Sequence, residues 1–303
     1  MLDYNSLKGS QPGEVKHEQF VSFLADIKTR LQVFATVNDE TKLNGNEYIA
    51  LYDDSEEIRN DYLFLLGNMH YVEGGHKCIA EFLEETRNLI DQPLANSSNI
   101  IKIRIHELFL YTMANYIKSK DYNTAGYTLG RTYLNHLQRG PGADSLGFQM
   151  FYSGSYHQQL EKAIRGRDSK NYFTGVGQHW METIANDFCT KEQFVLADLI
   201  CYNYSIYGKD YNCDWKWFPI TYVYDNEHNS SLGGIGKRLI SKEFVQEVLP
   251  LFGFDSVERF VEKMHLVENN QKELKNNCGY SGCFESPFIL GDFVKAETVA
   301  TLN

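Results

Sequence analysis

The sequence has few basic residues, few cysteines and no long apolar run. Its 29 lysines and arginines stand against 40 aspartates and glutamates, which gives a formal net charge of −11. Broad binding to a phosphate backbone depends on clustered lysine and arginine. We therefore expect no nucleic-acid partner for the chain as a whole, although a local basic pocket remains compatible with this charge.

The chain also lacks the signals that direct a protein into or across a membrane. No window approaches the ~20 apolar residues of a membrane-spanning helix. The first twenty residues, MLDYNSLKGSQPGEVKHEQF, contain no basic region followed by an apolar run, so they do not resemble a signal peptide. We expect a cytoplasmic protein with no membrane partner.

The six cysteines form neither a disulfide framework nor a zinc-site pattern. Only Cys278 and Cys283, in CGYSGC, lie close together. Their four-residue spacer is loose for a zinc knuckle, and no matching Cys/His pair follows. The other four are isolated, mostly in apolar surroundings, as reduced core thiols are: Cys78, Cys189, Cys201 and Cys213. We expect no metal and no cofactor.

Helical periodicity is the dominant pattern in the chain. Apolar residues recur at helical spacing in residues 18–34, 58–69 and 76–90. Asp54 and Glu57 have the spacing of a capping box before the second of these segments. The sequence therefore predicts three helices, which form an N-terminal helical bundle over residues 1–95.

The clearest break in the chain is DQPLANSSN, residues 91–99. Pro93 and the cluster of asparagine and serine are unfavourable in a helix interior. We place a boundary there and predict a larger helical module over residues 96–303. The sequence leaves open whether the two parts pack as one continuous domain.

The larger module begins with the strongest helical pair. Residues 100–119 are followed by the short turn KDYNT and then by AGYTLGRTYLNHLQ, residues 125–138. So short a turn predicts antiparallel neighbours, and hence a helical hairpin. Capping boxes precede two later helices, at Thr190 with Gln193 and at Asp255 with Glu258.

Strand signals are few. Only FPITYVYD, residues 218–225, and ESPFIL, residues 285–290, look β-like. We therefore predict a mainly α fold, a multi-helix bundle with antiparallel helical hairpins and at most minor β-structure.

The stretch HNSSLGGIGKRLISKEF resembles a phosphate-binding loop but does not fit one. Aligning Gly236 and Lys237 on the Walker A pattern puts Ser231 at the first glycine and Arg238 at the hydroxyl position. The sequence instead predicts a flexible connector before a helix capped by Ser241. Lys237 and Arg238 remain candidates for nucleotide or small-anion binding near a helix N-terminus.

Two further patterns carry alternative functions. The spacing of Arg131 and His136 fits the R-x4-6-H pattern of HEPN ribonucleases, in which the histidine acts as acid and base and the arginine steadies the phosphate. In that case RNA is the partner and no metal is needed. The competing interpretation is a helix with Tyr133 and Leu137 in the core and Arg131 facing solvent.

The aromatic stretch WKWFPITYVY offers either a binding platform or core packing. Its candidate binding residues are Trp215, Trp217 and Tyr222.

Intact catalytic motifs are missing: HELF, with His106 and Glu107, is not H-E-x-x-H, and there is no G-x-S-x-G.

Several phrases of residues 100–303 resemble all-helical modules that accompany TIR-type or SIR2-type effectors in bacterial antiphage defence proteins. The phrases are HELFLYTMANYIKSKDYNTAGYTL, FVLADLICYNYSIY with WKWFPITYVYD, ISKEFVQEVLPLFGFDS and LGDFVKAETVATL. The resemblance implies sensing, scaffolding or oligomerisation, with no catalytic residue to carry over and the effector on another polypeptide. We therefore predict a non-enzymatic protein that recognises a protein partner or a second copy of itself, with residues 208–240 as the contact surface.

Overall fold

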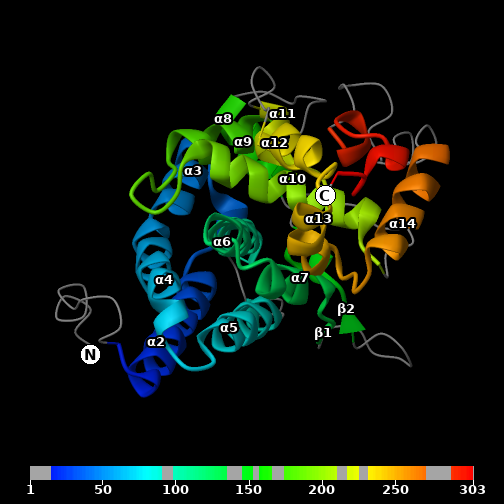
Figure 1. The fold of residues 1–303 in the computed structure, drawn as a ribbon. Coiled ribbons are helices and arrows are strands. Elements are labelled where there is room, and N and C mark those ends of the chain that lie inside the picture. The colour runs from blue at the N-terminus through cyan, green and yellow to red at the C-terminus, as the bar shows by residue number, and fades with distance from the viewer. Residues whose placement is uncertain are drawn as a thin grey trace.

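The computed structural model is built mainly from helices (Figure 1), so the predicted mainly α fold is confirmed. It describes residues 15–90, 98–134, 145–152, 157–165, 174–209, 217–224, 231–270 and 288–302. The α-helices are α2 (His17–Val37), α3 (Gly45–Asp53), α4 (Glu56–Asn68), α5 (Gly75–Ile90), α6 (Ser98–Lys118), α7 (Tyr122–Gly130), α8 (His157–Arg165), α9 (Thr174–Glu182), α10 (Lys191–Tyr207), α11 (Ile220–Tyr224), α12 (Ser231–Arg238), α13 (Lys242–Val248) and α14 (Val257–Asn269).

Short elements complete the described part of the chain. Strands β1 (Tyr133–Leu134) and β2 (Ser145–Leu146) pair antiparallel. The 3-10 turns are η1 (Glu40–Lys42), η2 (Met69–Tyr71), η3 (Phe148–Phe151), η5 (Leu249–Phe252), η6 (Leu290–Asp292) and η7 (Ala296–Thr298). Among the described residues, no helix is long and apolar enough to span a bilayer.

Helix α6 is the element around which the others are arranged. Figure 1 looks nearly along its axis, with α2, α4 and α5 on one side and α10 on the other. Every residue from Ile100 to Ala114 is buried, although Lys102, Arg104 and Glu107 are among them. A helix enclosed on all sides is normally apolar all round, so these charged side chains need partners inside the protein.

The described residues before position 91 and after position 97 contribute to one hydrophobic core. Buried side chains from α2, α4 and α5 belong to the same cluster as those from α6, α7, α10 and the C-terminal segment. The predicted boundary itself lies outside the described residues. In the described part, α6 packs against helices that precede it and helices that follow it in the sequence.

Two buried carboxylates cap helices other than the element to which they belong. Glu40 accepts hydrogen bonds from the backbone N–H groups of Asn99 (3.4 Å) and Ile100 (3.2 Å), at the start of α6. Glu161 accepts from Gly175 and Val176 (both 2.9 Å), at the start of α9. Both satisfy N–H groups that a helix leaves without an internal acceptor, and so they fix where α6 and α9 begin.

The C-terminal segment is held by α10. Asn203 donates from Nδ2 to the carbonyl oxygen of Phe288 (3.1 Å) and accepts at Oδ1 from the N–H of Leu290 (3.0 Å). The strand predicted over residues 285–290 is not found in its described part, residues 288–290, because these backbone groups pair with a side chain rather than with a strand.

The predicted helix starts are partly correct. Thr190 and Gln193 do form the capping box of α10. The other two capping boxes are wrong by one residue, since the N-caps are Ser55 for α4 and Ser256 for α14. Ser256 accepts from the N–H of Arg259, while the neighbouring Asp255 pairs with the arginine side chain.

Two predicted elements have a different structure. Residues 220–224 form α11 rather than a strand, because Asp198 of α10 accepts a hydrogen bond from the N–H of Thr221 at the start of this helix. Helix α7 stops at Gly130 instead of continuing to residue 138. A Cβ at Gly130 would lie 2.9 Å from the Tyr204 hydroxyl, and the chain then turns into β1.

The glycine-rich stretch is also different from its prediction. Residues 231–238 form helix α12, not a loop. Gly233 and Gly236 face Phe293, and a Cβ at either position would lie within 3.0 Å of the Phe293 side chain. The glycines therefore permit close packing of this helix against the C-terminal segment rather than loop mobility.

We expect opposite effects of alanine at two helical glycines. A Cβ at Gly126 of α7 would lie 1.7 Å from the carbonyl oxygen of Pro250, whereas a Cβ at Gly234 of α12 meets no atom within 4 Å. Gly126→Ala should lower the free energy of unfolding by about 1–3 kcal/mol through overpacking. Gly234→Ala should raise it by about 0.5–1 kcal/mol. Urea unfolding measures both, and changes of the same sign would contradict this account.

Candidate binding cleft

The aromatic stretch proposed for binding lies mostly in the core. Trp217 and Tyr222 are buried, and Trp215 lies outside the described residues. The indole Nε1 of Trp217 donates a hydrogen bond to Asp198 (2.6 Å). Trp217 and Tyr222 are therefore packing residues, in agreement with the core-packing interpretation of this stretch, and neither side chain is exposed.

Lys237 and Arg238 lie in the last turn of α12, shortly before Ser241, the N-cap of α13. The Arg238 guanidinium lies over the Phe244 ring at 3.8 Å, and its Nη2 is 3.9 Å from Glu247. The predicted cap of the next helix is confirmed, because Ser241 accepts from the N–H of Phe244. A ring and a carboxylate thus already engage the guanidinium of Arg238, and nucleotide or small-anion binding by Lys237 and Arg238 stays a prediction.

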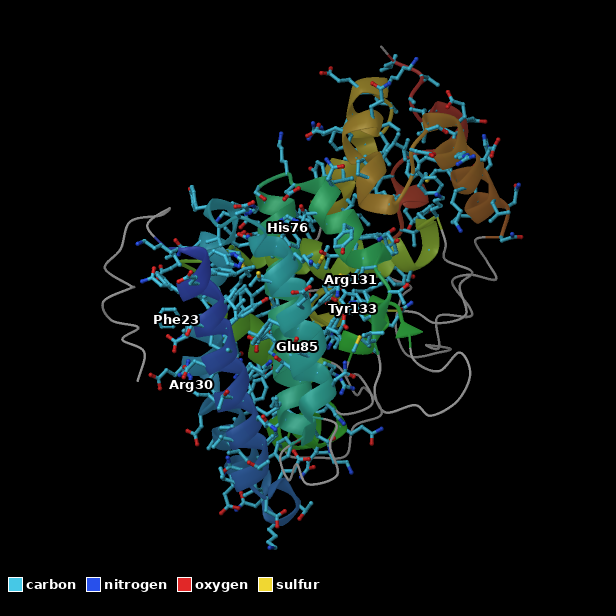
Figure 2. All side chains as sticks on the ribbon, turned by 90° about the horizontal axis from the view of Figure 1, so that it is seen from below. Phe23, Arg30, His76, Glu85, Arg131 and Tyr133 are labelled. Atoms are coloured by element: carbon cyan, nitrogen blue, oxygen red, sulfur yellow. The ribbon has the colours of Figure 1, made fainter. Side chains whose placement is uncertain are left out.

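Arg131 follows the end of α7 and forms an ion pair with Glu84 of α5, with Nη2 2.8 Å from Oε2. It also lies over the Tyr133 ring at 5.2 Å, and Figure 2 shows both side chains beside α5. His136 lies outside the described residues, so the ribonuclease hypothesis stays a prediction. The described geometry gives it no support, because a carboxylate occupies the guanidinium that would hold a phosphate.

A cleft of about 600 Å³ lies between α4 and the turn that connects α9 to α10. Its lining combines apolar side chains, two amides, one carboxylate and one arginine. The lining residues are Arg59, Asn60, Leu63, Phe64, Ile184, Ala185, Asn186, Asp187 and Phe188. Such a mixture of apolar surface with a few polar groups is typical of binding sites.

The turn that forms one wall of the cleft is fastened by side chains of α4 and α6. The N–H of Ala185 donates to the Tyr111 hydroxyl (3.0 Å), and Lys118 Nζ donates to the carbonyl oxygen of Phe188 (2.8 Å). Arg59 Nη1 donates to the carbonyl oxygen of Thr183 (3.0 Å). Three anchors over six residues hold this wall at a fixed distance from α4.

Arg59 is a buried charged group in the lining of the cleft, and hydrogen bonds fix the position of its side chain. Its side chain is only 5% exposed. Nε donates to Asn60 (3.2 Å), and Nη1 donates to Glu107 Oε1 (3.3 Å). Burial disfavours the charged guanidinium, but Glu107 and Glu56 outweigh burial and raise the pKa of Arg59. The arginine is therefore charged at every accessible pH.

Behind Arg59, Glu107 is the centre of a buried polar cluster on α6. It is fully buried, and it accepts hydrogen bonds from Arg104 Nη1 and from the Tyr52 hydroxyl (2.6 Å) as well as from Arg59. Burial is the largest single influence on this carboxyl and opposes its charge. The two arginines together with these hydrogen bonds prevail, so the pKa of Glu107 is lowered.

The remaining groups of the cluster are also satisfied. Arg104 donates to the Ser55 hydroxyl (2.8 Å) and to the carbonyl oxygen of Tyr52 (2.9 Å), and Trp180 Nε1 donates to the Tyr52 hydroxyl (2.7 Å). Because the pKa of Glu107 is lowered and its carboxyl stays ionised, the cluster is not suited to proton transfer. It can supply a fixed electrostatic environment for the cleft.

No group of three or more His, Cys, Asp or Glu side chains suited to hold a metal occurs in the described ranges. One feature of the sequence indicated the buried polar cluster around Glu107. Arg104 and Glu107 stand three residues apart within an otherwise apolar helix. Nothing in the sequence indicated that Arg59 joins them from another helix.

Comparison of the chain with protein families, with characterised proteins and with solved structures finds no match in any of the three.

Removing the charge of Glu107 should destabilise the protein strongly. Glu107→Gln leaves Arg104 and Arg59 without their shared buried carboxylate, and breaking such a pair costs about 3–5 kcal/mol. Glu85→Gln is the matched control, because it removes an exposed carboxylate whose pairing with Lys28 is worth less than about 1 kcal/mol. Chemical denaturation compares the two, and a similar loss in both variants would refute the structural role of Glu107.

A second buried carboxylate should make stability depend on pH. Asp198 accepts hydrogen bonds from Trp217 Nε1 (2.6 Å), from the N–H of Thr221 (2.9 Å) and from its hydroxyl (2.8 Å). These bonds favour the ionised form, but burial outweighs them and raises the pKa of Asp198 from 3.8 to about 6. The folded state therefore binds the proton more tightly than the unfolded state does.

The stability that Asp198 contributes should fall as the pH rises towards its folded-state pKa. Between pH 4 and 6 the unfolded state has lost this proton and the folded state still holds it, so the stabilisation falls as pH rises. We expect wild type to lose roughly 3 kcal/mol relative to Asp198→Asn over this range, at about 1.4 kcal/mol per pH unit, and no more above pH 6. Urea titrations of both proteins at each pH measure the difference, and a flat difference would exclude a raised pKa.

Proposed function

We propose that the chain is a non-enzymatic helical protein that recognises a partner protein through the cleft between α4 and residues 184–188. The observation that carries this proposal is a permanently charged arginine, 5% exposed, in the lining of an open cleft. Arginine is among the residues most enriched where protein interfaces concentrate their binding energy. The cleft therefore replaces residues 208–240 as the proposed contact surface.

The construction of the cleft supports recognition rather than chemistry. Its arginine is oriented by Glu107, and its opposite wall is anchored at Thr183, Ala185 and Phe188. Walls that are already in place reduce the ordering cost of binding. The apolar side chains of Leu63, Phe64 and Phe188 supply surface to bury.

The biological setting of the proposal comes from the resemblance of residues 100–303 to helical modules of antiphage defence. In such a system the partner is another polypeptide, an effector or the component that triggers it. The chain would then act as a cytoplasmic sensor or scaffold in a bacterial cell. The Arg131–His136 ribonuclease remains the alternative of a different class.

Crosslinking and affinity measurements test the proposal. A photo-crosslinking amino acid at Asn186, on the cleft, should capture one partner protein in the native cells, and the same group at Val33, exposed on α2, should not. With the purified partner, Asn186→Arg should weaken binding at least tenfold, because it fills the cleft mouth and adds a charge. Val33→Arg should leave the affinity within twofold.

Three outcomes would overturn the proposal. Capture of a second copy of this chain would assign the cleft to self-assembly. Equal loss of affinity in both arginine variants would place the contact elsewhere. Consumption of RNA, NAD or ATP by the purified chain, abolished by a point substitution, would make it an enzyme.

A further inference from the structure

We infer that the cleft binds a single carboxylate carried on an apolar or aromatic group, and that it discriminates against phosphate. The inference rests on the proposed role of the cleft as the recognition site. It concerns the chemistry of the ligand, which can be tested without knowing the partner.

The hydrogen bonding of Arg59 leaves one donor for a ligand. Nε and Nη1 donate to Asn60, Glu107 and Thr183. Within the described part of the chain, Nη2 has no acceptor. The arginine lines the cleft, so this nitrogen can donate to a ligand there. A charge-assisted hydrogen bond from a guanidinium to a carboxylate is about twice as strong as a neutral one.

The charges around the cleft limit how negative the ligand can be. Glu107 and Glu56 lie 3.3 Å and 3.5 Å from Arg59 Nη1, and Asp187 lies in the lining of the cleft. Arg104, bound to Glu107, is the other positive group of the cluster. Three carboxylates thus stand in or beside the cleft with two guanidiniums, while the Lys118 ammonium is engaged by the carbonyl oxygen of Phe188 in its wall. A monoanion can use the open donor, whereas a dianionic phosphate ester brings a second charge that the carboxylates repel.

The rest of the lining offers amide donors and an apolar surface. Asn60 and Asn186 can donate amide hydrogen bonds to a carboxylate oxygen. Leu63, Phe64 and Phe188 form the apolar part of the same cleft. An aromatic ring next to the carboxylate would bury its surface against these side chains. A free aryl-alkyl acid, a peptide C-terminus after an aromatic residue and an acidic side chain beside one share this chemistry.

The probes are 3-phenylpropanoate, the neutral 3-phenylpropan-1-ol and phenyl phosphate, titrated into the full chain by calorimetry. We expect saturable binding of the carboxylate and at least tenfold weaker binding of the other two. Acetyl-Ala-Phe with a free carboxylate, its C-terminal amide, and an acetylated, amidated Glu-Phe dipeptide then separate the three sources of the carboxylate. Whichever binds tightest identifies the source.

Variants of the cleft that leave Arg59 in place test the site. Asp187→Asn removes a lining carboxylate and should strengthen 3-phenylpropanoate binding two- to fivefold at low salt. Asn60→Asp keeps an acceptor for Arg59 Nε but adds a charge, and should weaken binding at least fivefold. Glu297→Gln removes an exposed carboxylate that does not line the cleft and should change nothing.

The outcomes separate this inference from the proposed function. Equal or tighter binding of phenyl phosphate, no binding of any probe, or no response to Asp187→Asn and Asn60→Asp overturns the inference. If a partner occupies the cleft and is not displaced by 3-phenylpropanoate, the inference fails and the proposed function stands. If the carboxylates bind but no protein is captured at Asn186, the inference stands and the proposed function fails.

Discussion

The negative charge of Glu107 is buried at the middle of the molecule, and the surrounding helices are positioned by the groups that neutralise it. Arg104 comes from the same helix, Arg59 and Tyr52 come from α4 and α3, and Trp180 of α9 donates to Tyr52. A buried carboxylate without such partners would be severely unfavourable. Three helices that meet at one charge, with α9 joined to them through Tyr52, therefore have little freedom to shift against each other, and the cleft at Arg59 takes its geometry from this arrangement.

Other buried carboxylates also pair with groups from other segments, in their case the backbone N–H groups at helix starts. Glu40 caps α6 from a distant part of the sequence, and Glu161 and Asp198 cap α9 and α11, the helices that follow their own. The unsatisfied N–H groups of a helix start favour a negative charge. Here they also bring remote segments together. This use of carboxylates inside the protein accounts for some of the acidity that composition alone would assign to the surface.

The predictions from sequence succeeded where a local pattern and the tertiary structure agree. The apolar stripe of Phe20, Phe23, Leu24, Ile27 and Leu31 is the buried face of α2, and α10 is buried over most of its length as its composition indicated. They failed where a distant side chain decides the local structure. Asp198 fixes α11 in a stretch with strand-like composition, and Phe293 packs against the glycines of α12. Neither Asp198 nor Phe293 belongs to the segment whose structure it decides, so the sequence of that segment alone does not reveal it.

The sequence by itself determined the helical character of the chain, most of its apolar faces, and the helix starts at Thr190 and Ser241, because these depend on residues within one or two turns of each other. The tertiary structure alone decided which polar groups meet. Arg59 and Glu107 are 48 residues apart in the chain, and the turn at residues 184–188 reaches them from a third element. A cleft is formed by packing between helices, and its electrostatics depend on burial, so both become defined only when the helices come together.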